Sequence, residues 1–162
     1  MGFPMQQEHA APERVRAALL AAGIPAELVH FDATTRTAAD AASAIGTSVG
    51  QIVKSLVFLA GGRPVLALVS GSNQLDPGKL ARLTGTPIDK ANADTVRRAT
   101  SFAIGGVPPT GFPAPLQTYI DRDLLQYDVV WAAAGTPHDV FRIAPDELLR
   151  VTAGEVVDLR RD

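Results

Sequence analysis

One lysine stands in the middle of an apolar segment, where its ammonium could hold a negatively charged group. Lys54 lies within residues 51–59, Gln-Ile-Val-Lys-Ser-Leu-Val-Phe-Leu, whose β-branched and aromatic residues predict a strand. Side chains alternate along a strand, so Lys54 shares a face with Leu56 and Phe58. A buried ammonium is costly unless it reaches a partner or a cleft. Two interpretations stay open: the lysine stem carries its charge to the surface, or Lys54 serves a binding site.

The second candidate is a loop rich in glycine and proline. Residues 105–115, Gly-Gly-Val-Pro-Pro-Thr-Gly-Phe-Pro-Ala-Pro, contain three glycines and four prolines, which excludes regular structure. Glycines let a backbone approach a ligand closely and turn its N–H groups toward it, and prolines hold that shape. Such a loop can bind an oxyanion or phosphate, or it can be a rigid connector. The sequence leaves both open.

Other chemistry is poorly represented. The chain has no cysteine, which excludes disulfides, thiolate nucleophiles and cysteine-ligated metals, and its three histidines lack metal-ligand spacing. Ser70, His138 and Asp139 could form a triad only if the fold brought them together. His138, in a Gly-Thr-Pro-His turn, is either a turn residue or a pocket residue. We therefore expect no metal and no cofactor.

Composition favours one globular domain. The chain has 162 residues, 46% of them hydrophobic, and a formal charge of −2 from 15 basic and 17 acidic side chains. This excludes extensive disorder and a strongly cationic surface, although a local phosphate-contacting patch remains open. Its candidates are Lys79, Arg82, Lys90, Arg97 and Arg98. With no signal peptide and no membrane-spanning stretch, a cytoplasmic location without membrane contact is expected.

The elements that must position these residues can be placed along the chain. Residues 1–11 are expected to be a loose leader, and Pro12 to open a helix that Gly23 ends. Further helices are expected at 37–45, 76–84, 92–100 and 145–151, and strands at 26–31, 51–59, 65–70, 116–120, 128–134, 140–143 and 156–159. We expect a single α+β domain over 12–162. Its sheet is mixed, mostly antiparallel and partly barrel-like, with short helices beside it.

These residues together carry a family resemblance. The strand Gln51–Phe58, the Val-Ser-Gly segment at 69–71, Lys79-Leu80 and Ile104–Gly111 resemble the YbaK family of prolyl-tRNA-synthetase-associated (ProX-like) editing domains. The segment from Trp131 to Pro137 is similar as well, so the resemblance covers about residues 12–160. The lysine strand and the Gly-x-x-x-Pro loop are specific as a pair, whereas either alone would be weak.

The resemblance implies a free-standing aminoacyl-tRNA deacylase that hydrolyses the ester between a wrong, small amino acid and the 3′-terminal adenosine of tRNA. The tRNA acceptor end is then the partner, with a synthetase as a further candidate. The catalytic candidates are Lys54, Gly105, Gly106 and Pro109, and the substrate-binding candidates are Ser70, Val107, Pro108, Gly111, Phe112 and His138. Many relatives have His after the loop where this chain has Phe112, which puts proton transfer at that position in doubt.

The residues are compatible with this chemistry. An aminoacyl ester is already activated, so a site needs mainly positioning and stabilisation of the oxyanion. Backbone amides of Gly105–Pro109 could stabilise the oxyanion, and Lys54 could neutralise a phosphate or orient the adenosine. The attacking group would be water, the ribose hydroxyl or a substrate thiol. The alternative is a catalytically silent module that binds tRNA or a synthetase.

Overall fold

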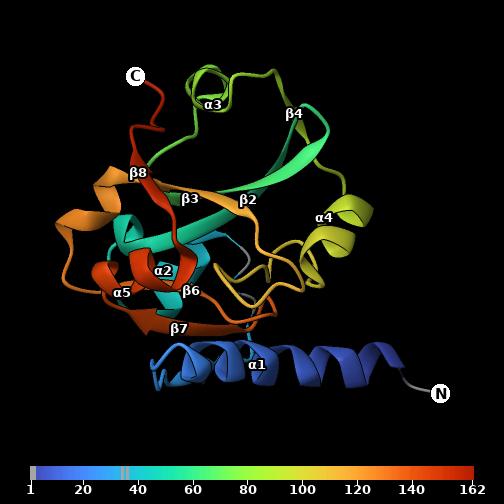
Figure 1. Ribbon diagram of the computed structural model, residues 1–162. Helices are drawn as coiled ribbons and strands as arrows, with labels where there is room; N and C mark the ends of the chain where they lie inside the picture. The colour runs from blue at the N-terminus through green and yellow to red at the C-terminus, as the bar shows by residue number, and fades with distance from the viewer. Residues whose placement is uncertain (1–2, 34, 36) are drawn as a thin grey trace.

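An open mixed sheet forms the centre of the molecule, with helices on both of its faces (Figure 1). The computed structural model describes residues 3–33, 35 and 37–162. The helices are α1 (Phe3–Ala21), α2 (Ala38–Ile45), α3 (Pro77–Thr84), α4 (Ala93–Thr100) and α5 (Pro145–Thr152), with 3₁₀ turns η1 (Val49–Gln51) and η2 (Arg122–Gln126). The strands are β1 (Leu28–His30), β2 (Ile52–Ala60), β3 (Arg63–Ser70), β4 (Ile88–Lys90), β5 (Gln117–Asp121), β6 (Val130–Ala133), β7 (Asp139–Ile143) and β8 (Glu155–Val157).

The strands follow the order β1-β7-β6-β2-β3-β5-β8, and β4 pairs with β2 outside this path. The pairs β1–β7, β6–β7, β2–β3 and β2–β4 are antiparallel, whereas β2–β6, β3–β5 and β5–β8 are parallel. The predicted α+β class and the mostly antiparallel sheet are therefore confirmed. Over the described residues the sheet runs from β1 to β8 without closing, so it is open rather than barrel-like.

The β2–β3 hairpin is the longest pairing in the sheet, and the opposite edge of β2 pairs with two different strands. Gly61 and Gly62 form the turn at φ 57° and 83°, a backbone that only glycine adopts at little cost. On the opposite edge of β2, Ile52 and Val53 pair with β6, and residues 58–60 pair with β4. Residues 54–57 lie between the two partners and are paired with neither. This interruption places Lys54 at an unpaired stretch of sheet edge.

The two faces of the sheet are covered by different helices. Val15 and Leu19 of α1, Val96 of α4 and Leu148 of α5 pack with β-strand residues in the larger core cluster. Leu80 of α3 packs with the opposite face. Each fully buried leucine contributes about 1.5–3 kcal/mol through removal of apolar surface from water.

Local signals explain several helix boundaries. Side-chain oxygens of Thr37, Asp76 and Asn92 accept backbone N–H groups at the starts of α2, α3 and α4. Gly46 and Gly85 end α2 and α3 in the left-handed conformation.

Two expectations about elements were wrong. Residues 3–11 are helical, so the loose leader is replaced by the first half of α1, and Pro12 lies inside that helix instead of opening it. Residues 1–2 of the predicted leader lie outside the described residues. The short strand β4 was not expected, because its three residues gain their strand conformation from pairing with β2.

Candidate functional site

A cavity of about 470 Å³ opens at the unpaired edge of β2. Val53, Lys54, Ser55 and Leu56 form one wall of it. The other walls come from the 35–41 segment, from the loop before β5 and from β6 and β7; they include Thr35, Thr37, Ala38, Ala41, Ile104, Gly105, Val107, Trp131, Ala132, Ala133 and Val140. Lys54 and the glycine loop therefore line one cavity, although they are about fifty residues apart in the chain.

Lys54 is half-buried at this cavity, and its ammonium is held from one side. Nζ donates a hydrogen bond to the backbone oxygen of Asn73. Burial lowers the pKa of Lys54, and the negative charge of Asp121 raises it in part. Burial thus disfavours the charged form of Lys54, and the Asp121 carboxylate partly restores it. Of the two interpretations, a cleft lysine fits this geometry better than one whose charge simply reaches open solvent.

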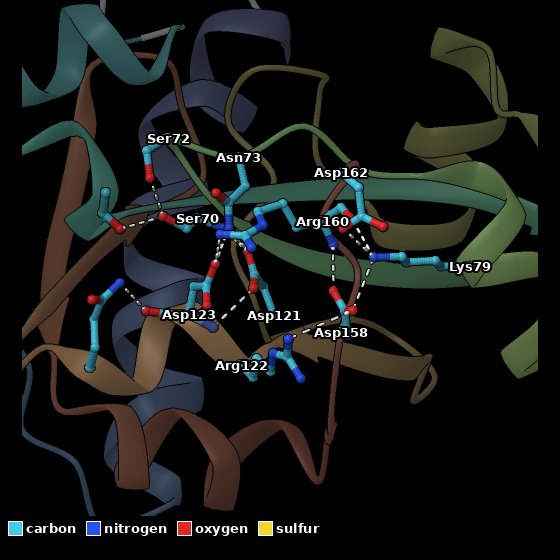
Figure 2. A network of polar contacts seen from close by, with 12 residues as sticks. Ser70, Ser72, Asn73, Lys79, Asp121, Arg122, Asp123, Asp158, Arg160 and Asp162 are labelled. Carbon is cyan, nitrogen blue, oxygen red and sulfur yellow. Dashed lines mark hydrogen bonds and ion pairs between the residues drawn. The ribbon is translucent and has the colours of Figure 1, made fainter.

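Asn73, which binds Lys54 through its backbone oxygen, belongs to a largely buried polar network with Ser70, Asp121 and Asp123 (Figure 2). The Asp121 carboxylate is 1% exposed and accepts hydrogen bonds from the Ser70 N–H at 3.0 Å and from Nδ2 of Asn73 at 2.8 Å. It also accepts the Asp123 N–H at 2.9 Å, and Asp123 accepts Nδ2 of Asn73 in turn. Because both Asn73 side-chain contacts anchor the residue whose carbonyl receives Lys54, the network fixes the position of the ammonium.

The glycine loop meets the cavity through a tight turn. The Gly106 N–H donates to the Ala103 oxygen at 3.0 Å, and Gly105 has φ 92°, the left-handed position that a type II turn reserves for glycine. The Gly106 amide is therefore used within the turn, and Pro108 and Pro109 have no N–H. Of the predicted oxyanion donors, only the amides of Gly105 and Val107 remain as candidates.

Several candidate residues lie away from the Lys54 cavity. Pro109, Gly111 and Phe112 line a separate depression beside α1 and α5, where the Phe112 ring meets Phe102 edge-on at 6.4 Å. Pro108 is buried in the loop. Their position supports neither the catalytic role predicted for Pro109 nor the substrate-binding roles predicted for Pro108, Gly111 and Phe112.

The residues of the imagined triad are also separated from the cavity. Ser70 is fully buried, and its hydroxyl donates to the Gly50 oxygen at 2.7 Å. Nδ1 of His138 lies 3.1 Å from the Phe31 oxygen, and Nδ1 of His30 lies 2.9 Å from Asp139. Ser70 and Asp139 are each engaged in contacts of their own, with no bond to His138 among those described. These contacts give each of the three residues a structural role.

Sequence reasoning missed Ser55 and Trp131. The Ser55 hydroxyl is buried and has no hydrogen-bond partner among the described residues. Only its place next to Lys54 could have drawn attention to it. Trp131, opposite Ile52 in the β2–β6 register, is the single tryptophan of the chain, and that was the available signal.

The expected basic patch is divided. Lys79 of α3 is paired with Asp158 at 3.0 Å and Asp162 at 3.3 Å, and these partners raise its pKa (Figure 2). Arg97 and Arg98 lie on α4, elsewhere in the molecule (Figure 1). The five basic residues thus do not form one surface.

Within the described ranges, no cluster of three or more His, Asp or Glu side chains could hold a metal ion. No helix among these residues is both long and apolar enough to cross a bilayer.

Comparison with known proteins decides the family. A family model of the aminoacyl-tRNA editing domain matches residues 32–151. The chain belongs to the aminoacyl-tRNA editing domain family. A solved structure described as a candidate trans-editing enzyme for prolyl-tRNA synthetase is 50% identical, with a TM-score of 0.90, and the match covers 94% of this chain and 98% of the other.

Two curated relatives of this editing domain extend the comparison. A candidate Cys-tRNA(Pro)/Cys-tRNA(Cys) deacylase of Enterococcus faecalis is 27% identical, over 76% of each chain. The proline–tRNA ligase of Streptococcus sanguinis is 29% identical over 77% of this chain, but only 20% of the ligase is covered. The predicted family, fold class and aminoacyl-tRNA deacylase activity are confirmed by these matches.

Proposed function

We propose that this editing domain acts as a free-standing enzyme in the cytoplasm and removes a small amino acid from the 3′ end of mischarged tRNA. The observation that carries the proposal is the convergence of Lys54 with Gly105 and Val107 on one cavity, in a chain of the editing family. We assign roles to Lys54, Gly105 and Val107 because all three line this cavity.

The reaction needs few groups. The oxygen of a water molecule bonds to the ester carbonyl carbon and loses a proton, and negative charge develops on the carbonyl oxygen. The bond from that carbon to the ribose oxygen then breaks, and the ribose oxygen takes a proton. The Lys54 ammonium and the amides of Gly105 and Val107 are the donors we propose for the negatively charged oxygen or the neighbouring phosphate. The chain has no cysteine to form a thioester with the amino acid.

The walls of the cavity support a small amino acid. Ala41, Ala132 and Ala133 line it together with Val140, so most of its surface is apolar and offers few polar groups to a long, charged side chain. Apolar pockets discriminate weakly between side chains that differ by one methylene. We therefore propose a class of small amino acids rather than one member.

The relatives suggest which partner is relevant. The descriptions of two of them name tRNA for proline or prolyl-tRNA synthetase, and the third is a proline–tRNA ligase that carries a segment similar to this chain. We propose that tRNA for proline is the substrate and that prolyl-tRNA synthetase is the candidate protein partner.

Deacylation of a panel of mischarged tRNAs tests the proposal. Wild type should release at least one small amino acid, and Lys54→Ala should lose this activity while its melting temperature stays close to wild type. Lys54→Arg should not restore activity, because a planar guanidinium does not replace a compact ammonium. Binding of tRNA without hydrolysis of any panel member would favour the silent module. Normal turnover by folded Lys54→Ala would end the catalytic role.

A further inference from the structure

A second cavity, of about 660 Å³, lies beside the first and is basic. Arg14 of α1 and Arg97 of α4 line it, and no acidic side chain is among its described lining residues. The remaining walls are small or apolar: Ala10, Ala11, Ser101, Phe102, Ala103, Gly135, Thr136 and Pro137. A concave site with two guanidinium groups and no carboxylate suits a polyanionic ligand.

Two segments of chain connect this cavity to the Lys54 cavity. Residues 101–103 line the basic cavity, and Ile104, Gly105 and Val107 line the other. In the same way, residues 135–137 line the basic cavity, and residues 132, 133 and 140 line the other. The wall between them is thin, because a Cβ on Gly106 would lie 2.6 Å from Cα of Thr136. The two cavities therefore share two bordering segments, which pack directly against each other at Gly106 and Thr136.

Arg14 is held in place before any ligand binds. Nη2 donates to the Ser101 oxygen at 3.0 Å, and the guanidinium lies 4.4 Å from the centre of the Phe102 ring. A guanidinium has five N–H donors, so this bond leaves others for a ligand. The contacts with Ser101 and Phe102 reduce the rotamer entropy that ligand binding would otherwise cost.

Arg97 is placed differently from its neighbour. Both Arg97 and Arg98 lie in the last turn of α4, where positive charge stabilises the helix dipole. Arg98 donates to Oγ1 of Thr95 and does not line the basic cavity, whereas Arg97 does. The helix dipole accounts for a basic residue in this turn but not for the convergence of Arg97 with Arg14, which is 83 positions away in the chain.

We infer that the basic cavity binds phosphodiester groups of the single-stranded 3′ end of tRNA, just upstream of the ester in the Lys54 cavity. This inference rests on the proposed function. The terminal adenosine occupies the first cavity, and the preceding nucleotides cross the Gly106–Thr136 wall. Arg14 and Arg97 then contact their phosphates, which hold the ester in register with Lys54.

Steady-state deacylation with two substrates tests the inference. One is mischarged tRNA, and the other is the same amino acid esterified to adenosine, which has no phosphodiester. Arg97→Gln and Arg14→Gln should lower kcat/KM on tRNA by about tenfold and leave it unchanged on the aminoacyl adenosine. The matched control is Arg161→Gln, at an exposed arginine that lines neither cavity and whose backbone N–H donates to Gln74 before α3; it should change neither.

Binding of uncharged tRNA provides a readout independent of catalysis. The slope of log K against log salt should become less steep by about 0.7 for each single-strand phosphate that a variant no longer neutralises. Equal losses on both substrates would overturn the inference, and so would unchanged tRNA binding by both variants. An effect seen only with synthetase present would also overturn it and assign the cavity to a protein partner. If wild type hydrolyses no substrate but its tRNA binding still depends on Arg14 and Arg97, the proposed function is refuted and the phosphate-binding site is supported.

Discussion

Asp121→Asn is the substitution whose consequences the structure defines most closely. It preserves the shape of the side chain and changes one acceptor oxygen into an NH₂ donor. The native carboxylate accepts from the Ser70 N–H, from Nδ2 of Asn73 and from the Asp123 N–H. An asparagine oxygen can satisfy the first two donors, but its NH₂ group then faces the Asp123 N–H. One hydrogen bond is removed outright and two lose their charge assistance.

The magnitude follows from these contacts. A hydrogen bond to a charged group contributes about 1.5–3 kcal/mol, and an amide costs less to bury than a carboxylate, so the net loss should be about 2–4 kcal/mol. For a domain of this size, that corresponds to a fall in Tm of about 4–16 °C. The matched control is Asp128→Asn, at an exposed carboxylate, which should change stability by less than about 0.5 kcal/mol.

The same substitution should alter Lys54. The negative charge of Asp121 raises the pKa of Lys54, so its removal should lower that pKa further. NMR titration of the labelled lysine Cε groups measures the midpoint in wild type and variant. Equal Tm values for Asp121→Asn and Asp128→Asn would refute the network as a source of stability. An unchanged Lys54 midpoint would refute its electrostatic coupling to Asp121.

Three further predictions concern the cavity walls. Burial lowers the pKa of Lys54 in the folded protein below 10.5, its value in the unfolded chain. The free energy of unfolding should therefore rise with pH between these two pKa values. Denaturant unfolding at pH 7 and pH 10 should show this rise in wild type and not in Lys54→Met. Ser55→Ala should leave the free energy of unfolding unchanged or raise it, because the Ser55 hydroxyl has no partner among the described residues. Ser70→Ala should lower that free energy by about 1–3 kcal/mol, because the Gly50 oxygen loses its hydrogen bond. Equal effects of the two substitutions would contradict this prediction. Gly106→Ala should cost about 1–3 kcal/mol, since its Cβ meets backbone of Thr136, and an unchanged Tm would exclude the close wall.

Local chemistry in the sequence was enough to predict several elements. Interactions within a few residues form the caps of α2 and α3 and the Gly61-Gly62 turn, so these features can be predicted from the sequence alone. The apolar strand around Lys54 was equally clear. These features depend on bonds between near neighbours or on a single strong strand signal.

The role of each loop residue could not be seen in the same way. Which amides of the glycine loop are available depends on the turn that uses the Gly106 N–H. Phe112 and Gly111 follow directly in the chain, yet they face α1 and α5 in a different depression. Sequence proximity to a site residue says little about direction once a turn reverses the backbone.

By itself the sequence determined the strand that carries Lys54, the absence of cysteine chemistry and the helices whose caps are local. Only the tertiary structure decided that β6 and β4 leave residues 54–57 unpaired, and that Asp121 supports Lys54 through Asn73. It also brought Arg14 beside Arg97. The physical reason is that these arrangements arise from packing between segments far apart in the chain. The free energy that stabilises these arrangements comes from contacts between distant segments, so it cannot be inferred from any short stretch of residues.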